Sequence, residues 1–205
     1  MGSFEYLQSR SGGSVKRRTA QMGTSGFLVA QPSAASTTVT LEELGQGSRH
    51  LTKCTIAGLP ITVGNTTGIS FGSAALLTFP KGVVHIEAVS VDDFKFDLTD
   101  DAGNVTPLTT AMGGDFSLGS AATADATLNG TEVNILASTS YDPFSTAVDA
   151  NSAINAILDG SSTPITVYVN AIVDDADVAD GASDQIEIGT TAAPVYVYIK
   201  WSMVR

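Results

Sequence analysis

Apolar and polar residues alternate with a period of two along much of the chain after about residue 51. In residues 195–203, Val195, Val197, Ile199 and Trp201 fall on one face, while two tyrosines, a lysine and a serine fall on the other. A β-strand with one buried face shows this alternation. Residues 165–173 repeat the arrangement, so two strands are predicted, each with one buried face.

Seven more segments have strand composition and are separated by clusters of Gly, Pro, Asn and Asp that are typical of turns. They are residues 51–56, 59–63, 75–79, 83–91, 94–98, 115–120 and 133–138. Strands at this spacing are typical of sandwiches and jelly rolls. The pattern predicts an all-β protein whose residues 46–205 form an antiparallel, jelly-roll-like β-sandwich.

One segment, residues 149–158, fits a short helix better than a strand. Ile154, Ile157 and Leu158 fall on one helical face, Asp149 or Asn151 could cap the start, and Gly160 could end it. We therefore expect at most one short helix.

Residues 1–45 have a different composition, with Gly/Ser-rich stretches, a basic run and only isolated apolar patches. Such a segment buries too little apolar surface to offset its ordering entropy. We expect an extended N-terminal arm that becomes ordered by lying on a neighbour. Its expected partner-binding residues are Arg10, Lys16, Arg17, Arg18, Phe27, Leu28 and Val29.

Charge is distributed unevenly, and the formal net charge is −11. Residues 1–53 carry six basic and three acidic side chains, whereas residues 54–205 carry four basic and eighteen acidic ones. An acidic body repels nucleic-acid backbones and anionic membranes, so neither is an expected partner. The basic N-terminal arm could bind an acidic partner.

Cys54 is the only cysteine, which excludes an intrachain disulfide and a cysteine-based zinc site. This fits synthesis in a reducing cytoplasm. No run of apolar residues is long enough for a membrane helix, and the first ten residues do not resemble a signal peptide.

Residues 68–72 match the G-x-S-x-G nucleophile elbow, with Ser70 at its centre. The elbow requires a helix after the serine, then an acidic residue and a histidine. The only histidine after Ser70 is His85, with no acidic residue between them, and Pro80 leaves little room for a helix. A turn between strands is the preferred interpretation, and no catalytic residue is predicted.

A histidine and an aspartate-rich loop are two further candidate sites. His85 lies in an alternating run and shares a face with Glu87, so it is expected to point toward solvent or a carboxylate. Residues 174–184 are rich in aspartate, but the spacing excludes an EF-hand; a looser calcium site using Asp175, Asp177 and Asp180 stays open beside a plain solvated loop. No cofactor or metal site is predicted.

Several sequence segments resemble those of virion structural proteins from marine and cyanobacterial tailed phages. They are residues 26–33, 81–87, 160–171, the 174–184 loop and the final alternating strand. The resemblance implies a jelly-roll-like domain, a homotrimer, that binds the outside of the capsid. It carries over no functional residues.

The expected function is therefore that of a capsid decoration, or cement, protein without enzymatic activity, held partly by its arm. Its expected partners are the major capsid protein and copies of itself, and its expected location is the outer capsid surface after synthesis in the host cytoplasm. The alternatives are a tail, neck or fibre component or surface adhesin and, more remotely, a serine hydrolase using Ser70.

Overall fold

A computed structural model describes residues 18–19, 38–46, 49–62, 64–66, 69–99, 105–106, 114–141, 148–152, 154–173 and 185–204. Across these residues the protein is built from strands, and every strand pair is antiparallel. The only helical element in these ranges is a 3₁₀ turn, η2 (Gly130–Glu132). None of the described segments forms a helix long and apolar enough to cross a bilayer. The expected all-β, antiparallel class is confirmed.

The largest sheet has seven strands in the order β1-β2-β3-β16-β7-β12, with β13 also paired to β7. Its long central strands, β16 and β7, carry the alternation that the sequence shows. The strands are β1 (Arg18–Thr19), β2 (Val39–Gln46), β3 (Arg49–Ile56), β7 (Gly82–Phe94), β12 (Val148–Ser152), β13 (Ala156–Gly160) and β16 (Val195–Val204).

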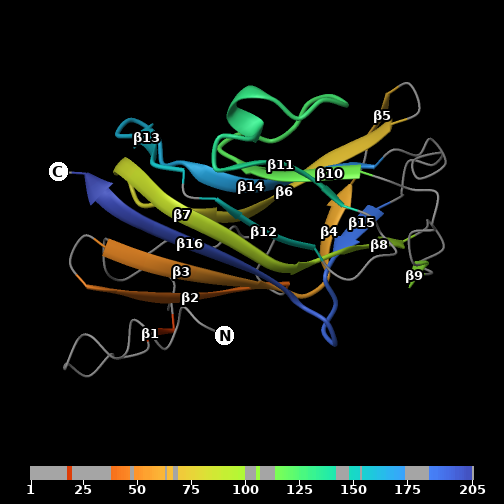
Figure 1. Ribbon diagram of the computed structural model, residues 1–205, viewed down its shortest axis with the longest axis horizontal. Helices are drawn as coiled ribbons and strands as arrows, with labels where there is room; N and C mark the ends of the chain where they lie inside the picture. Colours follow the sequence, from red (N-terminus) through yellow and green to blue (C-terminus); the bar gives the residue numbers. More distant parts are fainter. Residues whose placement is uncertain are drawn as a thin grey trace.

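A second sheet has five strands in the order β11-β10-β14-β6-β5, and a third has four in the order β4-β15-β8-β9. Figure 1 shows the five-stranded sheet above the seven-stranded one, with the four-stranded sheet at one end. The strands are β4 (Leu59–Thr62), β5 (Gly64–Thr66), β6 (Ile69–Thr78), β8 (Phe96–Thr99), β9 (Val105–Thr106), β10 (Gly114–Gly119), β11 (Leu136–Tyr141), β14 (Thr166–Val173) and β15 (Gln185–Ile188).

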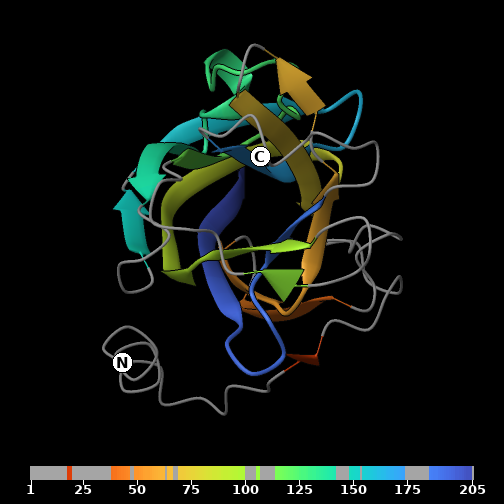
Figure 2. The same cartoon turned by 90° about the vertical axis from the view of Figure 1, so that its right-hand side faces the viewer.

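Residues of all three sheets form the core, and Figure 2 shows the strands arranged around it. Phe94 at the end of β7 stacks on Phe116 of β10, with ring centroids 3.6 Å apart. Phe79, just after β6, meets the ring of Trp201 of β16 edge-on at 5.1 Å. These two aromatic contacts join the seven-stranded sheet to the five-stranded sheet, and aromatic pairs add stabilisation beyond the area they bury.

The helix expected at residues 149–158 is wrong. These residues form β12 and most of β13, which both pair with β7. Between the two strands Asn155 has a positive φ of 50°, which is incompatible with a continuous right-handed helix. Pairing with the long β7 decides the conformation, and Ile157 is left exposed on β13 instead of facing a core.

The eight residues of β2 belong to the seven-stranded sheet, although the sequence assigned most of them to the arm. β2 pairs with β3 along its full length, from Val39 opposite Ile56 to Gln46 opposite Arg49. Val39 and Leu41 are buried in the core. The sheet therefore begins before the boundary placed at residue 45. Of the preceding residues, the structure describes only Arg18 and Thr19 as β1 and Thr38.

Residues 120–135, between β10 and β11, are held against the five-stranded sheet by one buried amide. The carbonyl oxygen of Asn170 in β14 accepts hydrogen bonds from the Ser73 hydroxyl and the Thr123 backbone N–H. Its NH₂ group donates to the backbone carbonyls of Ala121 and Glu132. Asn170 is fully buried, so these bonds satisfy a polar group that would otherwise be costly to bury.

Candidate functional site

The serine of the elbow-like motif lies inside a strand. Ser70 is the second residue of β6, it is fully buried, and it pairs in register with Val173 of β14. β6 continues to Thr78, so the strand-to-helix turn that exposes a catalytic serine is not formed here. The turn between strands that the sequence analysis preferred for residues 68–72 is also wrong for Ser70 and the residues after it, because they lie within β6.

Gly72 of the same motif has a packing role. A Cβ at this position would lie 2.5 Å from the Ile61 side chain and 2.6 Å from the Thr62 carbonyl oxygen, both in β4. Glycine therefore allows the four-stranded sheet to approach β6 closely. The last glycine of the motif is therefore explained by close packing of β6 against β4.

His85 lies on the outer face of the seven-stranded sheet, where its Nε2 is 3.1 Å from the side-chain oxygen of Asn155. Glu87 lies on the same face, as expected, and its carboxylate pairs with Lys200 of β16 at 2.6 Å. The hydrogen bond from Lys200 is the main reason that the pKa of Glu87 lies below its usual value. His85 has an amide neighbour, and the carboxylate has its own cationic partner.

Most of the sequence-predicted binding residues lie outside the described part of the chain. This holds for Arg10, Lys16, Arg17, Phe27, Leu28 and Val29, and for the aspartate-rich residues 174–184. Arg18 is placed by its backbone as the first residue of β1, opposite Glu43 of β2. Within the described ranges, no group of three or more His, Cys, Asp or Glu side chains is arranged to hold a metal ion.

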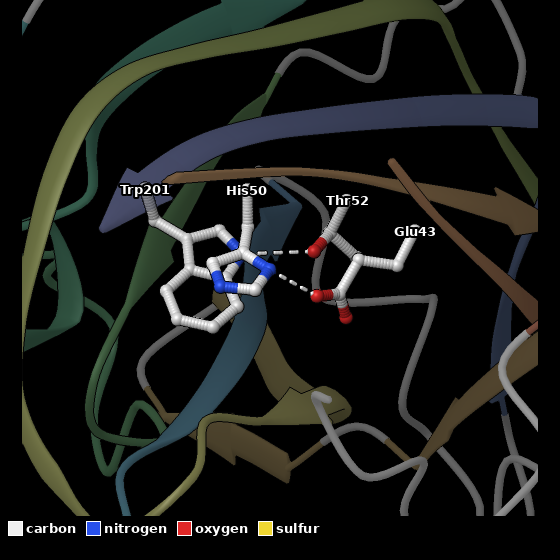
Figure 3. Close-up of polar contacts among 4 residues, drawn as sticks. All are labelled: Glu43, His50, Thr52 and Trp201. Atoms are coloured by element: carbon white, nitrogen blue, oxygen red, sulfur yellow. Dashed lines mark hydrogen bonds and ion pairs between the residues drawn. The ribbon is translucent and has the colours of Figure 1, made fainter. Parts of the chain in front are cut away.

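The structure brings together a polar cluster that the sequence analysis did not identify. Glu43, His50, Thr52 and Trp201 all face the core from the adjacent strands β2, β3 and β16 (Figure 3). Trp201 is paired with His50 in register, and Glu43 is paired with Thr52. Alternation in β2 and β3 could have indicated this face, because these polar residues continue the apolar positions Val39, Leu41, Cys54 and Ile56.

The cluster is linked by short contacts. His50 Nδ1 is 2.5 Å from Glu43 Oε1, and the indole Nε1–H of Trp201 donates to Thr52 Oγ1 at 2.9 Å. The imidazole and indole rings stack with centroids 4.2 Å apart and an interplanar angle of 13°. Glu43 and His50 are only 4% and 8% exposed, so water screens their interaction weakly. Such a pair ties the edge strand β2 to the centre of the sheet.

Gly45 provides the space for this pair at the end of β2. A Cβ there would lie 2.9 Å from His50 Nδ1 and 2.6 Å from the Arg49 carbonyl oxygen. His50 Nε2 is buried and has no hydrogen-bond partner among the described residues. A catalytic histidine–carboxylate pair would need a nucleophile at this nitrogen. The cluster as described joins three strands and holds no hydroxyl in that position.

A shallow hollow of about 330 Å³ lies where β7 meets the start of β16. The ring of Tyr196 forms part of its wall, and the ammonium of Lys53 lies 4.5 Å from the centroid of this ring. Asp93 has a positive φ of 60°, which is uncommon for a residue other than glycine. The lining residues are Asp93, Lys95, Ala192, Ala193, Pro194 and Tyr196.

No family model, no curated protein and no solved structure matches this chain.

Proposed function

We propose that the protein is a structural virion component that binds and stabilises the outside of a phage capsid as a decoration, or cement, protein. In this proposal it is a homotrimer with a jelly-roll-like body, made in the host cytoplasm and anchored partly by its N-terminal segment. The major capsid protein and further copies of the chain are its partners. It binds no nucleic acid or membrane, and it performs no catalysis.

The observation that carries this proposal is the pairing of β1 with β2. Arg18 and Thr19 lie antiparallel to Glu43 and Glu42 at the edge of the seven-stranded sheet. The N-terminal segment thus makes main-chain contacts of the kind used in β-augmentation, where an extended segment adds a strand to a sheet edge. An arm that docks in this way is suited to fastening a rigid body to an assembly.

The body has properties that support such a role. Its strands bury a continuous apolar core, and the Glu43–His50–Trp201 cluster ties the edge strand into it. On a shell with repeated binding sites, several weak contacts per body give high avidity without a large single interface. The resemblance of the sequence to phage virion proteins is the reason for proposing a phage capsid as this shell.

The proposal is tested by adding purified protein to heads that lack decoration and separating bound from free protein by sedimentation. We expect saturable binding and regular density on the outer head surface by electron microscopy. A variant lacking residues 1–36 should retain the strand spectrum of the body and lose most of its binding. Undecorated heads at saturating protein, or density confined to the tail, would count against the proposal.

The hollow beside Tyr196 favours a second candidate, a tail, neck or fibre component or adhesin that binds glycans. The hollow offers one aromatic ring, that of Tyr196, and one carboxylate, that of Asp93, which are suited to a sugar ring and its hydroxyls. A glycan array with the Tyr196→Ala variant tests this candidate. Tyr198→Ala is the matched control, because Tyr198 lies two residues further along β16 and does not line the hollow. Glycan binding lost only in Tyr196→Ala would support the second candidate.

A further inference from the structure

β2 has a described strand on each of its two sides, but the two neighbours differ in length. On one side β2 pairs with β3 over all eight residues. On its other side only Glu42 and Glu43 have a described strand neighbour, the two-residue β1. An extended segment can add to a sheet at such a position by main-chain pairing, as β1 does here.

This edge is held in a fixed position before any strand joins it. Val39 and Leu41 are buried in the core, and Glu43 is bound by His50 at 2.5 Å. A preformed acceptor reduces the entropy lost on binding, because only the incoming segment has to become ordered. β2 is therefore a better acceptor than a loosely held edge strand.

The charge of the edge matches the segment that precedes β1. The side chain of Glu42 is 51% exposed, and its described cationic neighbour, Lys53, is as far as 4.0 Å away. Arg18, the first residue of β1, lies opposite Glu43, and Lys16 and Arg17 come directly before it in the sequence. Opposite charges on neighbouring strands stabilise the pairing, so the edge favours a basic segment.

The chain between β1 and β2 is much longer than a hairpin requires. β1 and β2 are antiparallel, and hairpin loops usually contain roughly two to five residues. Residues 20–38 lie between them here. Fully extended, a chain of this length spans about 60 Å, and its root-mean-square reach as a coil is about 25 Å.

We propose that the β1–β2 pairing is exchanged between copies: the segment with Arg18 and Thr19 of one chain pairs with Glu43 and Glu42 of a second. This inference rests on the proposed function and deepens it by naming the surface that receives the arm. Exchange preserves the contacts within the pair, so its cost is small. The balance depends on local concentration, and crowding on a shell favours exchange over pairing within a chain.

Two singly substituted full-length chains with tags of different size test the exchange without heads. One carries Thr19→Cys and the other Glu42→Cys; Cys54 is buried and stays in both. The mixture is bridged with a short bis-maleimide across a concentration series. Neither chain can form the 19–42 link within itself, so the mixed product reports contact between chains, and its excess over the collision control described below reports exchange. We expect the mixed product to rise with concentration and to involve about half of the chains near 1 mM, the usual effective concentration of tethered segments.

The matched control pairs Thr19→Cys with Asp159→Cys. Asp159 is an exposed acidic residue of β13, which pairs only with β7 among the described strands. We expect at least about ten-fold less mixed product from this control, because it reports random collision at the same concentration. Equal yields from the two mixtures, or no mixed product up to several millimolar, would overturn the inference. Head binding is measured separately, so failure of the exchange and failure of the proposed function are distinguishable.

Discussion

The imidazole ring of His50 lies nearly flat on the indole ring of Trp201, with the ring centroids 4.2 Å apart. His50 Nδ1 contacts the carboxylate of Glu43, and the indole N–H of Trp201 donates a hydrogen bond to the Thr52 hydroxyl. Four side chains from three strands thus form one buried unit. This unit makes the position of β2 dependent on β3 and β16.

We predict strong energetic coupling between Glu43 and His50. His50→Leu or Glu43→Leu alone leaves a buried polar group without its partner, and each should lower the free energy of unfolding by about 3 kcal/mol. The double variant should lose less than the sum of the two, by about 1–2 kcal/mol. Urea unfolding followed by the fluorescence of Trp201, the single tryptophan, measures all three. Additive losses would show that the two side chains act independently.

We predict that Gly72→Ala destabilises the protein by about 1–3 kcal/mol, because the added methyl group would overlap Ile61 and the Thr62 carbonyl. Gly64→Ala is the matched control. A Cβ at Gly64 lies 3.5 Å or more from the Phe71 ring, which is ordinary contact, so this change should be nearly neutral. Thermal unfolding measured by circular dichroism compares the two. A neutral Gly72→Ala would mean that β4 can move away without cost.

The Glu87–Lys200 pair should make stability depend on pH in the acidic range. Lys200 lowers the pKa of Glu87 below the ordinary value of 4.5, so the pair stabilises the folded state above about that pH. Its contribution is lost as the pH falls through the lowered pKa. Both side chains have access to solvent, so we expect less than about 1 kcal/mol.

The stability difference between the protein and its Lys200→Met variant measures this contribution by urea unfolding from pH 3 to 8. The difference should be constant above about pH 5 and shrink below about pH 4.5. Lys81→Met, at an exposed position in the turn between β6 and β7, is the control and should show no such change. A difference that grows toward low pH would refute the assigned role of the pair.

Cys54 should be unreactive in the folded protein. It is fully buried, and burial raises the pKa of its thiol from 9.0 to about 12. Because the thiolate is the reactive species, its fraction at pH 8 is about a thousand-fold lower than for an ordinary cysteine. We expect no labelling by a disulfide reagent at pH 8 over hours and one reactive thiol per chain in urea. Rapid labelling without denaturant would show that β3 opens readily.

The sequence was sufficient for the class of the protein and for its best strands. Residues 195–203 alternate so regularly that their buried face was predictable, and β16 confirms it. Residues 165–173 form the expected strand β14, but from Asn170 onward both of its faces are buried. Alternation is a local property, because successive side chains of a strand point to opposite faces whatever its partners are. Cys54 could likewise be predicted to be a packing residue rather than part of a disulfide or a cysteine-based metal site.

Tertiary structure decided what depends on neighbours distant in the sequence. Residues 149–158 have apolar spacing that fits a helix, but pairing with β7 turns them into strands, since backbone hydrogen bonds across a sheet override weak local preference. β2 was missed because Glu43 breaks its apolar face. The partner of this carboxylate, His50, lies on the next strand, β3. Trp201, which stacks on His50, lies 149 residues along the chain from its hydrogen-bond partner Thr52. Only folding brings such residues together, so only the structure reveals that a buried carboxylate is matched.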